Sequence, residues 1–146
     1  MVRVEHSVEI ACPPAEVFAF LTDPSNLPRW QESCLAAEAA DRPVTSGTRI
    51  SERRRFLGRE ARTHVEVVEL EPDRFYELES VDGPFPFTVR HELEPCAVGT
   101  RVRVVAEADP GRFLRLASRI VDRVVREATR ADFARLKALL ESEERQ

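Results

Sequence analysis

Two histidines stand at positions where they could bind a ligand or transfer a proton. His6 and His91 each lie in an alternating segment and share a face with apolar residues, so both side chains are expected to point inward. Imidazole titrates near neutral pH, which suits it to either role. The alternative is that each histidine is a hydrogen-bonded core residue, and the pattern alone leaves both explanations open.

An arginine with a nearby glutamate forms the second candidate group. Arg54 belongs to a run of three arginines at positions 53–55, and its parity matches that of Glu52, Ile50 and Phe56. An inward guanidinium can pair with Glu52 or with a carboxylate or enolate of a ligand. The alternative is an exposed face of solvated arginines with one internal ion pair.

Aromatic residues could complete a pocket around these groups. Trp30 is expected to pack at its base, and Phe87 shares the inward parity of His91. Tyr76 could offer its hydroxyl to a ligand or simply pack with one hydrogen bond. Phe85 stands between two prolines, which predicts a stiff flap at the mouth of the pocket.

A long C-terminal helix is predicted to cover the pocket. Asp109, Pro110 and Gly111 suit a helix start, and no glycine or proline follows. Apolar residues recur at helical spacing, which indicates an amphipathic helix roughly 45 Å long. Three residues of its apolar face are predicted to line the pocket: Leu114, Ala117 and Val121. Asp132 lies near the middle of that face, where pairing with an arginine or a backbone amide is favoured over a role as a cavity acid.

Strands precede this helix almost throughout the chain. Alternation and turn residues predict seven strands, at residues 2–10, 33–40, 48–57, 60–70, 74–81, 87–94 and 100–108. Two short helices are predicted at residues 15–21 and 27–30. Short turns join six of the strands, so we expect an α+β fold with one antiparallel sheet against the long helix.

An internal cavity between sheet and helix is the expected binding site. Alternate hairpin tips of a meander fall on one edge of the sheet, which predicts an opening near Gly58, Phe85 and Gly111. We expect this cavity to be elongated, mostly apolar and larger than any pocket on the outer face of the sheet.

Composition excludes several classes of protein. The chain has 146 residues, which predicts a single domain over residues 1–146, and its net charge of −4 argues against a nucleic-acid partner. Neither a membrane-spanning segment nor a signal peptide is indicated, so we expect a cytoplasmic protein. The cysteines at positions 12, 34 and 96 form no metal motif, and no nucleotide-binding loop is found, so neither a metal nor a cofactor is predicted.

The order of elements resembles the START-like, helix-grip (SRPBCC) superfamily, in its polyketide cyclase/dehydrase branch. The resemblance extends over nearly the whole chain, and each of its motifs is short. It is carried by ACPPAEVFAFL at 11–21, DP at 23–24, LPRW at 27–30, GTR at 47–49, EP at 71–72, GPF at 83–85, GTRV at 99–102 and LKALLE at 136–141.

The resemblance implies a curved seven-stranded sheet that grips the C-terminal helix around a mostly apolar cavity. The superfamily includes lipid carriers, small-molecule sensors, aromatase/cyclases and chaperone-binding domains, so it implies no single activity. Its aromatase/cyclases are thought to use an inward arginine in this region of the sheet, a role that would fall to Arg54. Those enzymes also line the cavity with several tryptophans, whereas this chain has only Trp30.

Three functions are therefore compatible with the sequence. The first is binding of a hydrophobic or amphipathic small molecule, such as a lipid, a polyketide or an aromatic metabolite. The second is an aromatase/cyclase or dehydratase acting on a polyketide intermediate, with no catalytic residue identified. The third is a protein-interaction domain without a ligand. Whether the protein is a monomer or a homodimer is left open.

Overall fold

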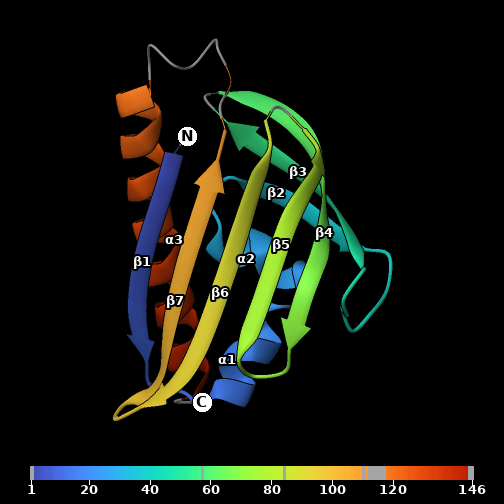
Figure 1. The fold of residues 1–146 in the computed structure, drawn as a ribbon. Coiled ribbons are helices and arrows are strands. Elements are labelled where there is room, and N and C mark those ends of the chain that lie inside the picture. Colours follow the sequence, from blue (N-terminus) through green and yellow to red (C-terminus); the bar gives the residue numbers. More distant parts are fainter. Residues whose placement is uncertain (1, 57, 84, 110, 112–117, 145–146) are drawn as a thin grey trace.

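One antiparallel sheet and one long helix form the framework of the molecule (Figure 1). The computed structural model describes residues 2–56, 58–83, 85–109, 111 and 118–144. Its strands are β1 (Val2–Ile10), β2 (Cys34–Ala39), β3 (Arg49–Phe56), β4 (Arg59–Glu71), β5 (Phe75–Asp82), β6 (Phe87–Cys96) and β7 (Gly99–Ala108). Its helices are α1 (Pro14–Leu21), the 3-10 turn η1 (Pro24–Asn26), α2 (Leu27–Trp30) and α3 (Ser118–Glu144).

The sheet is a meander to which the first strand is added at one edge. The strand order is β1-β7-β6-β5-β4-β3-β2, and every neighbouring pair is antiparallel. β1 pairs with β7 over its whole length, from Val2 opposite Ala108 to Ile10 opposite Thr100. Figure 1 shows α3 running along β1 and β7, with α1 and α2 behind the middle of the sheet. The α+β helix-grip fold expected from the sequence is therefore confirmed.

Alternation of residue types divides the sheet into an inner and an outer face. Val4 of β1 and the pair Val102 and Val104 of β7 are buried on the inner face. Their neighbours Glu5 and Arg103 form an ion pair on the outer face, with Nε of the arginine 2.7 Å from Oε1 of the glutamate. The apolar inner face packs against the helices, and this packing is the main source of stability of such a layered fold.

A glycine allows β7 to approach β1 closely at the end of the sheet where β1 leads into α1. Gly99 has φ of +151°, and a Cβ atom at this position would lie 2.5 Å from the carbonyl oxygen of Ile10. Beside it, the Thr100 hydroxyl donates a hydrogen bond of 2.7 Å to the carbonyl of Cys12. The chain therefore passes from β1 into α1 in contact with the β6–β7 turn.

The predicted elements agree with the structure except at their ends. β6 and β4 extend beyond the predicted ranges, and the turn η1 precedes α2. The register of β4 against β5 shifts between His64 and Val65 and again between Val67 and Glu69. These shifts explain the mixed parity of β4 in the sequence. The predicted start of the long helix, at Pro110 and residues 112–117, lies outside the described residues.

Candidate functional site

A cavity of about 240 Å³ lies between the inner face of the sheet and α3. Its walls come from α2, from strands β1 and β3–β7, from α3 and from the segment before β6. Five of the predicted ligand-binding residues line it: Trp30, Arg54, Phe85, Phe87 and His91. Most of the other walls are apolar and include Val65, Leu78, Val89, Val104, Ala106, Val125 and Phe133.

Arg54 is held at one end of the cavity by three side chains. Its Nε donates to Oε1 of Glu52 at 2.5 Å, its Nη1 to Oγ of Ser33 at 2.9 Å, and its Nη2 to Oε1 of Gln31 at 2.6 Å. Glu52 is only 3% exposed, so its carboxylate depends on this arginine for charge compensation. The inward parity of both residues is as the sequence predicts, and the guanidinium is engaged by the protein itself.

Asp132 connects α3 to the segment that follows α2. Its Oδ1 accepts a hydrogen bond of 3.3 Å from the backbone amide of Glu32 and contacts Nη1 of Arg135 at 3.4 Å. The same Nη1 donates to the carbonyl of Trp30 at 2.9 Å. Burial raises the pKa of Asp132, against the opposing effects of the amide and Arg135. These contacts are the pairing with an arginine and a backbone amide that the sequence favours for this residue.

His91 is a neutral imidazole in the wall of the cavity. It is 4% exposed, and burial lowers its pKa to about 4. Its Nδ1 lies 3.0 Å from the carbonyl oxygen of Tyr76, and the two rings stack with centroids 5.6 Å apart. A carbonyl oxygen only accepts hydrogen bonds, so Nδ1 carries the proton and Nε2 is left as an acceptor.

Tyr76 and Trp30 support this wall in different ways. Tyr76 is buried beneath His91 and does not line the cavity, and burial, with a smaller effect from Glu52, raises the pKa of its phenol. Trp30 packs edge-on against Phe133, with ring centroids 5.2 Å apart. The indole Nε1 of Trp30 is buried and has no hydrogen-bond partner among the residues that the structure describes.

The remaining predicted residues lie away from the cavity or outside the described part of the chain. His6 packs against Phe133 under α3, and burial together with the charge of Arg130 lowers its pKa. Val121 belongs to a separate cluster with two residues of β1 and does not line the cavity. Leu114 and Ala117 lie outside the described residues.

The opening of the cavity differs in part from the predicted one. Phe85 lines the cavity and contacts Phe87 edge-on, at a centroid distance of 6.3 Å. Gly58 and Gly111, predicted to lie near the same opening, are not among the lining residues.

Nearly the whole chain matches the model of one protein family. The family is described as polyketide cyclase / dehydrase and lipid transport, and its model matches residues 1–141. The chain belongs to this family. Among curated proteins, none matches the chain significantly.

Solved structures similar to this polyketide cyclase/dehydrase-type chain share its fold at low sequence identity. A START superfamily protein from Mycobacterium smegmatis is 14% identical, with a TM-score of 0.82 and coverage of 96% of this chain and 97% of the other. A protein from Thermus thermophilus is 20% identical, with a TM-score of 0.80 and 97% of both chains covered. A protein from Nitrosomonas europaea is 19% identical, with a TM-score of 0.75 and coverage of 99% and 97%.

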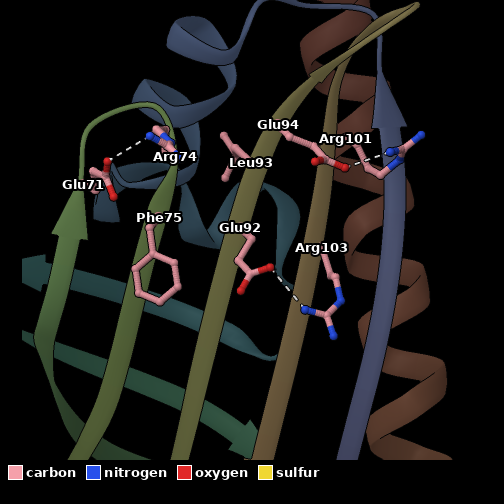
Figure 2. Close-up of a pocket in the computed structure, with 8 residues that line it drawn as sticks. All are labelled: Glu71, Arg74, Phe75, Glu92, Leu93, Glu94, Arg101 and Arg103. Atoms are coloured by element: carbon pink, nitrogen blue, oxygen red, sulfur yellow. Dashed lines mark hydrogen bonds and ion pairs between the residues drawn. The ribbon is translucent and has the colours of Figure 1, made fainter.

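Two other hollows of this polyketide cyclase/dehydrase-type domain are larger than the inner cavity and more polar. Figure 2 shows one, of about 360 Å³, where Arg101 and Arg103 of β7 face Glu94 and Glu92 of β6. The second, of about 390 Å³, lies over β2–β4 beside Arg53. The expectation that the inner cavity is the largest pocket is therefore wrong. Both hollows lie on the outer face of the sheet, where charged side chains supply most of their lining residues.

The sequence analysis missed several residues that line the cavity. Gln31 follows a helix of only one turn, and its position depends on the ion pair it joins. Phe133 and Thr129 lie one helical turn apart on α3 and continue the spacing of Leu136 and Leu140, so the helical period could have found them.

Within the described ranges, no group of three or more histidine, cysteine or acidic side chains could hold a metal ion. None of the described helices is both long and apolar enough to cross a membrane.

Proposed function

We propose that residues 1–146 form one START-like domain that binds a hydrophobic or amphipathic small molecule in the cavity between the sheet and α3. The observation that carries the proposal is the composition of this cavity, whose walls are mostly apolar and include polar side chains such as Arg54 and His91. Such a distribution is typical of small-molecule sites, in which apolar area supplies affinity and a few polar groups set the orientation.

The family and the geometry support the same ligand class. The family description joins cyclases and dehydrases with lipid transport, and both activities deal with largely hydrophobic molecules. In our proposal Trp30, Phe85 and Phe87 contact the apolar part of the ligand. His91 and Arg54 face its polar part.

Binding without catalysis is favoured over the cyclase or dehydratase alternative. A general base at neutral pH works best with a pKa near 7, whereas burial lowers the pKa of His91 to about 4. Arg54 already donates to Glu52, Ser33 and Gln31, so it is poorly placed to stabilise an enolate.

A neutral fluorescent probe tests the proposal directly. N-phenylnaphthylamine brightens on entering an apolar cavity, and we expect saturable binding with one site per chain. Ala106→Phe places a ring in the cavity wall and should abolish this binding. Ala36→Phe makes the same change at an exposed position of β2 and should leave it intact.

The same variants supply the refutation. If the probe does not bind, or if Ala106→Phe binds it as well as Ala36→Phe does, the cavity is not the site and the protein-interaction alternative gains support. Circular dichroism of both variants checks that each keeps its fold. Native mass spectrometry of gently purified protein then identifies any small molecule that co-purifies.

A further inference from the structure

The wall of the cavity contains a hydrogen-bond acceptor with no partner in the described part of the chain. His91 uses its Nδ1 proton on the carbonyl of Tyr76, which leaves Nε2 with a lone pair and no proton. No described residue donates to Nε2, although the ring is 4% exposed and lines the cavity. Nε2 keeps some exposure, unlike the fully buried Nε1 of Trp30, so a ligand in the cavity can donate a hydrogen bond to it and gain affinity.

A donor without a partner lies in the same wall. Trp30 is 1% exposed and lines the cavity, and its Nε1–H finds no acceptor among the described residues. Both rings pack around Phe133, at centroid distances of 5.2 Å for Trp30 and 6.1 Å for His91. A hydroxyl group is the simplest chemical group that meets both needs, because it donates one hydrogen bond and accepts others.

The charges around the cavity disfavour an anionic ligand. Among the described residues that line it, Arg54 is the one cation, and the acids Glu52, Glu107 and Asp132 contact Arg54, Arg3 and Arg135 respectively. Arg54 is in contact with Glu52, so its charge is compensated before a ligand arrives. A carboxylate also has no proton to donate to Nε2 of His91 and would place its oxygens against that lone pair.

We propose that the cavity selects neutral apolar molecules that carry a hydroxyl group, with the hydroxyl proton donated to Nε2 of His91 and its oxygen available to the indole of Trp30. This inference rests on the proposed function and adds the chemical class of the ligand. The site discriminates against carboxylates and against ethers of the same size, because neither provides a donor.

The single tryptophan provides the assay. Trp30 is the only tryptophan of the chain and lines the cavity, so its emission reports on occupancy without a label. Octanol, octyl methyl ether, octanoate and octylammonium share one alkyl chain and do not absorb with the indole. We expect octanol to bind roughly fivefold tighter than the ether, the range for one net hydrogen bond, and octanoate to bind more weakly than both.

A pair of variants assigns the preference to one histidine. His91→Phe keeps a ring to stack on Tyr76 but removes the acceptor, and it should reduce the octanol preference to near unity with little change for the ether. His6→Phe is the matched control, because His6 also faces inward but does not line the cavity, and it should keep the wild-type preference.

The outcomes separate this inference from the proposed function. If none of the four octyl compounds binds, the proposed function itself fails. If octanol and the ether bind equally well to the wild type, the cavity binds apolar ligands but the hydroxyl preference is refuted. Tighter binding of octanoate or octylammonium than of octanol also refutes it, as does equal loss of preference in the two variants. Should His91→Phe fail to fold, the wild-type comparison of the four compounds still decides.

Discussion

Removal of the Arg54 side chain should destabilise the protein through the carboxylate that it leaves behind. In Arg54→Met, the methionine occupies much of the same volume, but Glu52 at 3% exposure loses the Nε–H that lies 2.5 Å from Oε1. Breaking a buried ion pair by removing one partner costs about 3–5 kcal/mol. Arg54 is itself 25% exposed, so water can partly replace it and the lower end, about 3 kcal/mol, applies.

Thermal unfolding measures this loss. For a domain of this size, 1 kcal/mol corresponds to about 2–4 °C, so Arg54→Met should lower the melting temperature by roughly 10 °C. The double variant Glu52→Gln with Arg54→Met should recover most of the loss, because a neutral amide costs far less to bury than a carboxylate. Arg53→Met, on the outer face of the same strand, is the matched control and should stay within about 0.5 kcal/mol of the wild type.

Two results would refute this reasoning. If Arg54→Met and Arg53→Met melt at the same temperature, the pair with Glu52 contributes nothing. If the double variant is no more stable than Arg54→Met alone, the loss comes from the hydrogen bonds to Ser33 and Gln31 and not from a stranded charge.

Three further predictions concern Phe85 at the opening of the cavity, Gly99 at the start of β7 and the dependence of stability on pH. Phe85→Ala should change the rates at which N-phenylnaphthylamine binds and dissociates, as measured by stopped flow. It should lower the free energy of unfolding in denaturant by less than about 1 kcal/mol, as for a surface position. A loss of several kcal/mol would mark Phe85 as a core residue. Gly99→Ala should destabilise by more than about 2 kcal/mol in the same unfolding assay, because its Cβ would meet Ile10 and the positive φ is strained; an unchanged midpoint would contradict this. The pKa of His91 is about 4 in the folded protein and 6.5 in the unfolded chain, so the unfolded chain takes up the proton first as the pH falls. The free energy of unfolding of the wild type should therefore fall by about 3 kcal/mol between pH 6.5 and pH 4, and this part of the loss should be missing in His91→Phe. Unfolding measured over this pH range in both proteins checks this, and an equal loss in the two would contradict it.

Strand parity predicted which side chains point inward, but it did not predict which residues surround them. His6 and His91 have the same inward parity and come from strands two places apart in the sheet. Both rings lie near Phe133 of α3, at centroid distances of 6.2 Å for His6 and 6.1 Å for His91, but only His91 lines the cavity, while His6 lies on β1 under α3. Which inward residue is covered by the helix depends on where α3 crosses the sheet, and the sequence pattern of a single strand does not contain that information.

Local signals were reliable where one strand or one turn decides the outcome. Glu52 and Arg54 are two residues apart on one strand, so their common direction and their pairing followed from alternation. The contacts of Arg54 with Gln31 and Ser33 span more than 20 residues and arise from the way the segment after α2 runs beside β3. Such contacts depend on tertiary placement and could not be derived from spacing.

The pairing of β1 with β7 also determines when the chain can complete its fold. Strands β2 to β7 each pair with their neighbour in the sequence, so a growing chain can form them hairpin by hairpin. β1 is made before the other six strands and its partner β7 after all of them, and the hydrogen bond between Arg103 and Glu5 joins residues 98 positions apart. During synthesis the apolar face of β1 therefore stays uncovered until β7 and α3 are made. The pairing of β1 with β7 closes the long loop between them, and such a non-local pairing is expected to be slow and late. A chain that stalls on the ribosome before residue 99 leaves β1 unpaired with its apolar face uncovered, and such a strand is prone to aggregate.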